Sequence, residues 1–424
     1  MRNKPLVFIA LNEVNFDLVS RYVKSGDYPG FSKLLEYPNC LTVSEDEYEH
    51  LEPWIQWVSV YTGEAYKNHK VFRLGDIVKY PRELLFEYIE KSGYRVGCIS
   101  PINADNRTKN NGYFIPDPWT QTKSDETWWS KKLHSALTFF VNNNAEGKIT
   151  ISSALILIFG LINFIRAKNI LLYFNALLLS LKLRWYRALF LDIFLVDIEN
   201  ARRKKEKIDF SFIFLNAGAH IQHHYLFSSK FMDKNEISVI KRDPIEDMLR
   251  VYDKLLQGYI QDRSINLIVA TGLSQTAYDK NKFYYRLKDH EKFLSEVGIK
   301  PLSVRPAMTR DFFAYYINEE EAKNAINILK NLEIRGVLVF GDLQMQNSEI
   351  FATFNYPYEI SKDDFIKMDG HNIDIYNHTV FVAIKNGMHQ SLGYAFFSPE
   401  IKNIVPKQNS HVSCLNRAVK EYFK

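Results

Sequence analysis

The segment from Asn216 to Tyr225 contains the residues best placed to hold a metal ion. It follows an apolar run, Phe210 to Leu215, with the length and composition of a buried strand. Asn216 and His220 are four residues apart, so a helical turn after the strand would put them on one face. Parallel sheets keep their sites at the carboxyl ends of strands. We therefore expect Asn216 and His220 to point at one ligand; the alternative is a polar loop that only closes the strand.

Two acidic residues could take part in the same chemistry. Glu52 precedes Pro53, and proline is suited to the first position of a helix. A carboxylate there is stabilised by the helix dipole, so we interpret Glu52 as an N-cap or a substrate contact, with metal ligand and general base as alternatives. Glu13 follows the apolar run Leu6 to Leu11. It either binds a donor or satisfies a neighbouring backbone amide.

Strands and helices alternate on both sides of these residues. This rhythm predicts an α/β fold with a mostly parallel sheet that helices cover on both faces. Asp243, Pro244 and Glu246 together form a strong helix start. The strands that we expect in the main sheet are Leu6 to Leu11, Cys40 to Val43, Arg95 to Ser100, Asp209 to Leu215, Ile265 to Ala270, Val380 to Ile384, Gly387 to His389 and Tyr394 to Phe397.

Residues 120 to 205 break this rhythm. Three mostly apolar runs, 149 to 165, 170 to 181 and 185 to 196, are separated by basic residues. We interpret them as a helical insertion buried against the sheet. The alternatives are a helical hairpin at a membrane surface, since basic flanks suit anionic lipid, and a true membrane span, for which the first run is barely long enough.

The sequence thus divides into three parts. Residues 1 to 119, 206 to 282 and 373 to 424 form the α/β core, and residues 120 to 205 form the apolar insertion. Residues 283 to 372 are expected to form a small α+β cap, in which Asn318 and Glu321 make a capping box.

Composition excludes some classes of function. With a net charge of +5 and no basic run interleaved with stacking aromatics outside the insertion, the chain does not resemble a nucleic-acid-binding protein. The three cysteines lie far apart without metal-ligand spacing, which suits a reducing compartment. The first apolar run is interpreted as a strand and not as a signal peptide. We therefore expect a cytoplasmic protein, with peripheral membrane contact through 149 to 196 as the alternative.

The order of motifs resembles the alkaline phosphatase superfamily, closest to its phosphodiesterase and nucleotide-pyrophosphatase branch. The resemblance covers most of the chain outside 120 to 205. It rests on five segments: Ile9 to Glu13, the helix from Pro53 to Gly63, Asn68 to Val71, Asn216 to His220, and Gly387 to Gly393.

This resemblance implies two divalent ions that clamp a phosphate or sulfate ester, and a Thr or Ser nucleophile at a helix N-terminus. The sequence departs from that pattern at four places. Asn12 and Asn216 stand where the family has aspartates, and Glu52 or Pro53 stands where it has the nucleophile. Gly272 and Leu273 replace an Asp-His pair, so at most one metal site is expected to survive.

The surviving metal site is expected to consist of Asn216, His220 and His389, with one zinc or manganese ion. A structural, hydrogen-bonded role is the alternative for each histidine. Glu52 and Glu13 are the candidate catalytic residues. The candidate substrate-binding residues are Asn12, Asn15, Gln56, Ser59, His69 and His223.

Two functions follow from these assignments. The first is a divergent hydrolase or transferase that acts on a phospho- or sulfo-ester, a small molecule or a glycan, in cell-envelope polysaccharide metabolism. The alternative is a non-catalytic member of the fold that binds a glycan, a nucleotide or a partner protein through the same pocket.

Overall fold

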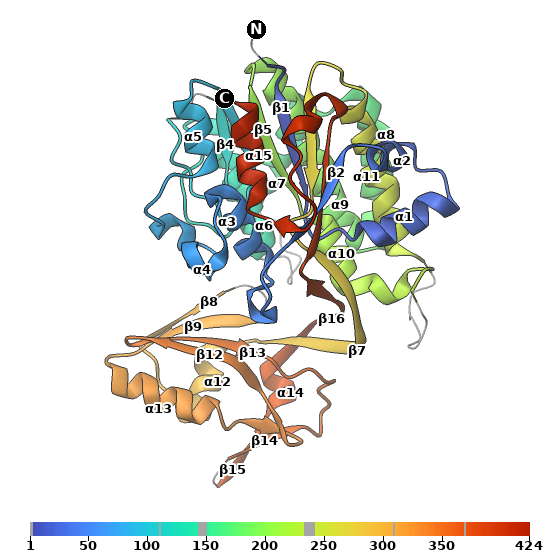
Figure 1. Ribbon diagram of the computed structural model, residues 1–424. Helices are drawn as coiled ribbons and strands as arrows, with labels where there is room; N and C mark the ends of the chain where they lie inside the picture. Colours follow the sequence, from blue (N-terminus) through green and yellow to red (C-terminus); the bar gives the residue numbers. More distant parts are fainter. Residues whose placement is uncertain (1–2, 110–111, 143–150, 233–241, 308–309, 369) are drawn as a thin grey trace. The chain divides into compact units, whose positions relative to one another are not determined.

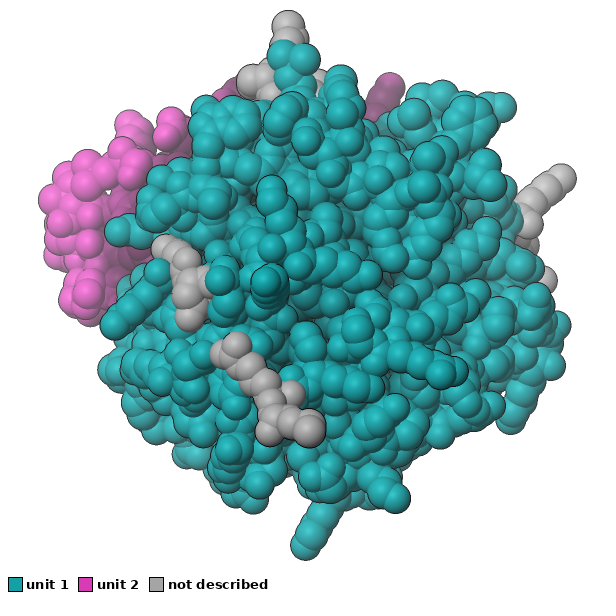
Figure 2. Space-filling view, turned by 90° about the horizontal axis from the view of Figure 1, so that it is seen from above, with its two compact units in different colours: residues 1–277, 387–424 teal, residues 278–386 magenta. Residues whose placement is uncertain are grey.

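The computed structural model describes residues 3–109, 112–142, 151–232, 242–307, 310–368 and 370–424. The chain forms two compact units (Figure 2). Unit 1 comprises residues 1–277 and 387–424, and unit 2 comprises residues 278–386. The candidate site residues all belong to unit 1.

Unit 1 is built on a mixed, mostly parallel sheet with the strand order β18-β2-β17-β6-β1-β5-β3-β4. β1 pairs in parallel with β5 on one side and with β6 on the other, whereas β17 runs antiparallel to β6 and β2. The strands are β1 (Leu6–Leu11), β2 (Asn39–Val43), β3 (Val96–Ile99), β4 (Tyr113–Ile115), β5 (Phe210–Leu215), β6 (Asn266–Ala270), β17 (Leu392–Phe397) and β18 (Ser410–His411). The predicted α/β class is confirmed.

The central strands β1 and β5 are buried on both faces because each of their residues is apolar or, at Ser211, small. Alternate residues of β1 enter two separate cores: Val7 and Ile9 face one, and Phe8 and Ala10 face the other. This pattern is typical of a parallel sheet that is covered on both sides. The covering helices lie on either side of β1 and β5 in Figure 1.

One core is covered by α1 (Phe16–Ser25), α2 (Pro29–Leu35), α10 (Ala217–Tyr225) and α11 (Pro244–Ile260). The other is covered by α3 (Pro53–Thr62), α5 (Leu85–Lys91) and α15 (Cys414–Tyr422). A short helix, α4 (Tyr66–His69), follows α3. The predicted start of α11 is confirmed, because the Asp243 side chain accepts hydrogen bonds from the backbone N–H groups of Ile245 and Glu246.

The predicted insertion is helical. It contains α6 (Trp128–Asn142), α7 (Ile151–Phe164), α8 (Ile170–Ser180) and α9 (Trp185–Lys205), and it belongs to unit 1. α9 packs on β5 and carries buried residues along its length. Residues 149 and 150 of the first apolar run lie outside the described residues. No helix in the described ranges has both the length and the apolar character needed to cross a bilayer.

Unit 2 is an α+β unit with its own core; it begins 5 residues before and ends 14 residues after the expected range of 283 to 372. Its main sheet has the order β12-β13-β9-β8, and Asn318 caps α13 as predicted. The elements are α12 (His290–Glu296), β8 (Ser303–Pro306), β9 (Asp311–Tyr315), α13 (Glu319–Leu329), β10 (Glu333–Ile334), β11 (Val337–Leu338), β12 (Phe340–Gln346), β13 (Glu349–Phe354), β14 (Phe365–Met368), β15 (His371–Asp374) and α14 (Ile375–His378).

Two long strands connect the units. β7 (Ser274–Leu287) and β16 (Thr379–Gln390) pair with each other and not with the main sheet. The expectation that Val380 to Ile384 and Gly387 to His389 rejoin the main sheet is therefore wrong. Both segments belong to β16, and of the three segments expected to return after the cap, Tyr394 to Phe397 in β17 is the one that pairs with the main sheet.

Candidate functional site

The site lies at one edge of the main sheet, where several chain segments end or begin. β1, β5 and β6 are parallel neighbours, so the residues that follow them share this edge. β17 is antiparallel to β6, so β17 begins at this same edge and the segment that precedes β17 ends there. This topology brings Glu13, after β1, close to His389, before β17, although the two are far apart in sequence.

The backbone at Glu13 turns its side chain inward. β1 ends at Leu11, and Glu13 adopts a left-handed conformation with a φ of 61°. Its N–H donates to the Thr271 carbonyl at 3.0 Å, and its own carbonyl accepts from Gln222 Nε2 at 2.8 Å. Because the pleat has ended, Glu13 does not follow the strand alternation, and its side chain is only 2% exposed.

Three side-chain atoms converge at the centre of the site. Glu13 Oε2 lies 3.1 Å from His223 Nε2 and 3.0 Å from His389 Nε2. The two imidazole Nε2 atoms lie 3.1 Å from each other. One carboxylate and two histidines thus form a nearly equilateral triangle of potential ligand atoms. We call this set of residues the Glu13 triad.

The second nitrogen of each imidazole identifies the tautomer. His223 Nδ1 lies 3.1 Å from the Gly387 carbonyl, which only accepts hydrogen bonds, so Nδ1 carries a proton. His389 Nδ1 lies 3.6 Å from Glu52 Oε2, which likewise favours a proton on Nδ1. In their neutral forms, both rings therefore direct the Nε2 lone pair towards the centre of the triad.

The carboxyl group of Glu13 is ionised. Burial raises its pKa, but the charges of His389 and His223 and their hydrogen bonds lower it by more. The net result is a pKa well below the usual range of a glutamate. The carboxylate also accepts from Gln275 Nε2 at 2.5 Å and from Asn12 Nδ2 at 3.0 Å. An anionic oxygen and two lone pairs repel one another unless a cation lies between them, whether a metal ion or protons on the imidazoles.

The residues of the triad fit a divalent metal ion. Two histidines and a glutamate are a donor set of catalytic zinc sites, which keep another position open. With metal–ligand bonds of about 2.0–2.1 Å, two ligand atoms are separated by about 2.9 Å at a right angle and about 3.3 Å at a tetrahedral angle. The observed separations of 3.0 and 3.1 Å lie in this interval.

The metal ligands expected from the sequence are only partly brought together. His389 belongs to the triad, where Glu13 and His223 accompany it. Asn216 precedes α10, and its Oδ1 accepts from Asn12 Nδ2 at 2.9 Å. His220 is exposed, and its ring faces that of His224 at a centroid distance of 4.7 Å. The structure therefore favours Glu13 and His223 over Asn216 and His220 as partners of His389.

Asn12 has a buried scaffolding position. Its Nδ2 donates to both Glu13 and Asn216, and its Oδ1 accepts from Trp57 Nε1 at 2.9 Å. Asn12 thereby joins the ends of β1 and β5 to helix α3. Gly272, with a φ of 75°, passes close beside the Trp57 indole, where a Cβ would be crowded. Neither Gly272 nor the buried Leu273 offers a ligand side chain.

Four other candidate substrate-binding residues form hydrogen bonds within the protein. Asn15 caps α1 through Leu18 N–H, and Gln56 Nε2 donates to the His50 carbonyl at 2.7 Å. Ser59 Oγ lies 3.1 Å from His69 Nε2, and His69 Nδ1 accepts from Val71 N–H. Burial lowers the pKa of His69 to about 4, so this ring is neutral. Of the six candidates, only His223 contributes an atom to the triad.

Glu52 is close to the triad without being a side-chain N-cap. Its backbone carbonyl accepts the first hydrogen bonds of α3, but its side chain makes no capping bond. The carboxylate instead lies beside His389 Nδ1. It is about one-third exposed, whereas Glu13 is buried. Glu52 thus occupies the position of a group that orients a ligand histidine.

Three residues that were not among the candidate site residues support the triad. Gln275 and Gln222 hold the side chain and the backbone of Glu13, respectively. Gly387 brings its carbonyl to His223, and a Cβ there would approach the Gln222 carbonyl to 2.5 Å. In the sequence, Gln222 directly precedes His223, Gly387 lies two residues before His389, and Gln275 follows shortly after β6. These positions are the signal that could have indicated them.

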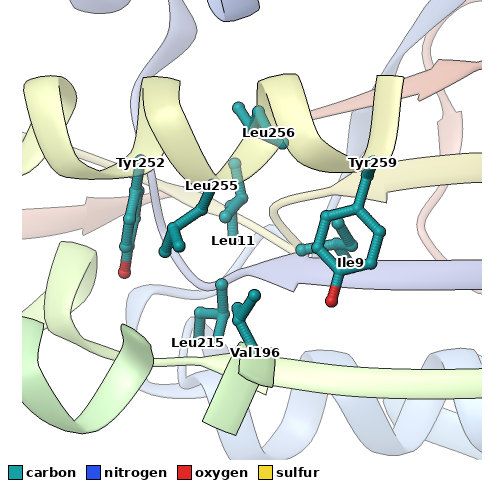
Figure 3. A pocket seen from close by; sticks show the side chains of 8 residues that line it. All are labelled: Ile9, Leu11, Val196, Leu215, Tyr252, Leu255, Leu256 and Tyr259. Carbon is teal, nitrogen blue, oxygen red and sulfur yellow. The ribbon is translucent and has the colours of Figure 1, made fainter. Parts of the chain in front are cut away.

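Two other features of the described residues are weaker candidates. Glu47, Glu49 and His50 could also surround an ion, but both carboxylates are exposed. A cavity of about 10 Å³ lies between the sheet, α9 and α11 (Figure 3). It is too small and too apolar to hold an ordered ligand. The residues that line it are Ile9, Leu11, Val196, Leu215, Tyr252, Leu255, Leu256 and Tyr259.

No protein-family model matches the chain, and no curated protein matches it in sequence. Solved structures do match over nearly its whole length. They include phosphonoacetate hydrolase from Sinorhizobium meliloti 1021 in complex with phosphonoacetate (10% identity, 99% of this chain and 96% of that chain, TM-score 0.43). Others are human ectonucleotide pyrophosphatase/phosphodiesterase 5 (10%, 99% and 95%, 0.41) and wild-type alkaline phosphatase PafA (11%, 99% and 96%, 0.47).

At these identities and TM-scores, the matches carry no argument about activity, which depends on the residues of the site. The three matched proteins are members of the alkaline phosphatase superfamily, the family that the order of motifs in this sequence resembles.

Proposed function

We propose that the protein is a divergent member of the alkaline phosphatase superfamily that hydrolyses or transfers a phospho- or sulfo-ester with a single divalent metal ion. The ion would be held by Glu13, His223 and His389. The observation that supports this proposal is the convergence of one carboxylate oxygen and two imidazole Nε2 atoms within 3.1 Å of one another. When both rings are neutral, all three atoms are acceptors, and a divalent cation would satisfy all of them at once.

Each neighbour of the triad would have a defined task. Glu52 and the Gly387 carbonyl hold the protons of the outer imidazole nitrogens and so fix both rings. Gln275 and Asn12 hold the Glu13 carboxylate. A divalent ion bound by these residues would supply Lewis-acid polarisation of an ester oxygen. Because Glu52 and Pro53 stand at the expected nucleophile position, water is the favoured attacking group.

A single ion is favoured over the pair that the family resemblance implies. Asn12 is buried in hydrogen bonds to Glu13, Asn216 and Trp57, so its donors and acceptor are already committed. Gly272 and Leu273 supply no ligand atom from their side chains. The donor set of the triad suits zinc or manganese.

The proposed substrate class includes more than one kind of ester. A small phosphate ester and a glycan ester both fit the chemistry of one Lewis acid beside Glu52. The apolar insertion favours a lipid-linked substrate of cell-envelope glycan metabolism, handled at the cytoplasmic side of a membrane.

Metal analysis of the purified protein tests this proposal. We expect about one zinc or manganese ion per chain in the wild type, and loss of that ion in His223→Ala and His389→Ala. His220→Ala is the matched control, because His220 lies on the same helix as His223 but is exposed. Hydrolysis of aryl phosphodiesters should require the metal and should fall in the same two variants. A control variant that loses metal as His223→Ala does would contradict the proposed ligand set.

A non-catalytic member of the fold is the second candidate. It is favoured by Asn12 and Asn216, which are hydrogen-bonded to each other where the family resemblance implies two acidic ligands. In this case the triad would be joined by imidazole protons and would bind a glycan, a nucleotide or a partner protein. A wild-type protein that contains no metal and shows no thermal shift with zinc, manganese or magnesium would support this candidate and overturn the first.

A further inference from the structure

Helices α7 and α8, together with the residue that follows α8, expose ten large apolar side chains. Each of these residues is about half exposed or more, with values between 49% for Phe159 and 78% for Ile162. We call this set the α7–α8 surface. Its members are Leu155, Ile158, Phe159, Ile162, Ile170, Leu171, Phe174, Leu177, Leu178 and Leu181.

The α7–α8 surface lies on the outward side of its helices, where an ordinary amphipathic helix has polar residues. The inward side of α8 is apolar as well, with Leu172, Tyr173 and Ala176 buried. A surface helix of a globular protein normally places polar residues opposite its buried stripe. The outward residues of α8 instead repeat at helical spacing as a second apolar stripe, from Ile170 to Leu181. This second stripe requires an apolar environment that unit 1 does not supply.

The segment between α7 and α8 is attached to α9, and both helices pack on α9. The Asp197 carboxylate accepts from the Arg166 N–H at 2.9 Å and from Asn169 Nδ2 at 2.6 Å, which fixes the turn between α7 and α8. Gly160 allows α7 to approach closely the rings of Phe194 on α9 and Trp129 on α6. The helices that carry the α7–α8 surface are therefore held in place by their packing on α6 and α9.

Two polar side chains of these helices hydrogen-bond to carbonyl groups of their own helix. Asn163 Nδ2 donates to the Phe159 carbonyl at 2.7 Å, and Ser180 Oγ donates to the Leu177 carbonyl at 2.7 Å. These bonds would persist after water is removed from the surface. The cost of transferring these two polar groups into an apolar medium is correspondingly small.

Charge distinguishes between the apolar environments that could cover this surface. Residues 147 to 191 contain no Asp or Glu but six basic residues. Lys168, Lys182, Arg184 and Arg187 are exposed beside the apolar stripes. A second copy of the chain would bring like charges together, whereas an anionic lipid surface would attract them.

The lengths of the helices determine how they would lie. α7 has 14 residues and α8 has 11, which correspond to about 21 Å and 16 Å at 1.5 Å per residue. Both are shorter than the hydrocarbon core of about 30 Å. We propose that the α7–α8 surface binds an anionic lipid bilayer, with both helices lying in the plane of the interface and the basic residues at the headgroups.

Vesicle sedimentation tests this proposal. The wild type should bind vesicles of phosphatidylcholine and phosphatidylglycerol in equal amounts much more strongly than vesicles of phosphatidylcholine alone, and salt should weaken the binding. Failure to bind the anionic vesicles at low salt would overturn the proposal. Light scattering without lipid adds a second outcome: a dimer that persists on dilution and shields the surface from vesicles would also overturn it.

Two variants separate the apolar and the charged contributions. Leu171→Gln/Phe174→Gln/Leu178→Gln should lower binding at least tenfold, because three side chains no longer favour the acyl region. Lys182→Gln/Arg184→Gln should lower binding to anionic vesicles roughly fivefold for each charge. All of these positions are exposed, so circular dichroism should report an unchanged fold.

The matched control is Leu302→Gln/Ile317→Gln/Leu338→Gln. These side chains are as exposed as those of the α7–α8 surface, but they belong to unit 2. The control should bind vesicles like the wild type. If it loses as much binding as the α7–α8 variant, or if only the charge variant loses binding, insertion of the α7–α8 surface is overturned.

Discussion

The Nε2 atoms of His223 and His389 lie 3.1 Å apart, and Glu13 Oε2 is equally close to both. The outer nitrogens of the two rings face the Gly387 carbonyl and the Glu52 carboxylate, respectively. When both rings are neutral, the two inner nitrogens therefore present lone pairs to each other and to an anion. This arrangement is unfavourable without a cation and favourable with one. The positions of the three triad side chains therefore depend on a bound cation.

Replacing Glu13 with Gln should remove this cation. The amide keeps the shape of the side chain but loses its charge, so affinity for zinc or manganese should fall at least tenfold. Differential scanning fluorimetry measures the effect. A metal ion at one hundred times its Kd stabilises the wild type by about 2.7 kcal/mol, and Glu13→Gln should show little of this gain.

Glu49→Gln is the control for this change. Glu49 belongs to the exposed group with Glu47 and His50, the other described cluster of metal-capable side chains. Its loss should leave the metal-induced shift unchanged. If Glu49→Gln abolishes the shift and Glu13→Gln preserves it, the cation is bound at the exposed group.

Replacing Asn12 with Asp should destabilise the metal-free protein. Asn12 Nδ2 donates to Glu13 and to Asn216 Oδ1, and an aspartate would replace both donors with a buried negative charge. We expect a loss of about 3 kcal/mol in the free energy of unfolding, measured with urea in the presence of a chelator. Added zinc or manganese should restore part of the loss, because it offsets the like charges.

Asn324→Asp provides the comparison, since Asn324 is exposed on α13 of unit 2. It should change the free energy of unfolding by less than about 0.5 kcal/mol. An Asn12→Asp variant as stable as Asn324→Asp would mean that the hydrogen bonds of Asn12 do not hold the ends of β1 and β5 together.

Gly387→Ala should disturb the support of His223. A Cβ at residue 387 would lie 2.5 Å from the Gln222 carbonyl and 2.6 Å from Gln275 Oε1. Both of these residues hold Glu13, so relief of the overlap must move part of the site. We expect a loss of about 1–3 kcal/mol in the free energy of unfolding, together with weaker metal binding.

Gly258→Ala is the matched glycine control. Gly258 lies inside α11, where the new methyl group would meet only the mobile end of Lys168. Alanine should gain up to about 1 kcal/mol in helix propensity at this position. If both alanine variants change stability and metal binding alike, the close contact at Gly387 does not determine the geometry of the site.

The main sheet was predictable because its central strands carry a local signal. The apolar runs that end at Leu11 and Leu215 stop at polar residues, and the structure ends β1 and β5 there. Burial on both faces gives such strands continuous apolar sequences. The pairing of β16 with β7 was not predictable in this way, because strand pairing across about one hundred residues leaves no local pattern.

The composition of the site was only partly predictable for the same reason. The spacing of Asn216 and His220 predicts that they share one face of a helix. It does not determine the direction in which that face points. That direction depends on how α10 packs against α11 and α9. Glu13 contributes to the triad only because β1 ends two residues earlier and the backbone adopts a positive φ. Neither fact can be read from the residue types.

The pH dependence of stability should carry the signature of Asp192. This residue is buried, and its carboxylate accepts from the Ala217 N–H at 3.0 Å and from the Tyr252 hydroxyl at 2.6 Å. Burial raises the pKa of Asp192 to about 7, although these hydrogen bonds oppose the rise. Asp192 packs at the start of α10, the helix that carries His223.

The sign of the effect follows from the protons that each state binds. Between about pH 4 and pH 7, the folded protein keeps the proton on Asp192 and the unfolded chain has lost it. The stability that this proton provides is complete below about pH 4 and is lost as pH rises through 7. The free energy of unfolding should therefore fall by up to about 1.4 kcal/mol per pH unit from this group.

Asp192→Asn isolates this contribution, because asparagine does not titrate. The free energy of unfolding of the wild type, measured with urea at intervals from pH 5 to pH 8, should fall relative to that of the variant up to about pH 7. Above that pH, the two curves should run parallel. A difference between wild type and variant that stays constant across the whole range would show that Asp192 is already ionised at pH 5, so that its hydrogen bonds to Ala217 and Tyr252 outweigh the cost of its burial.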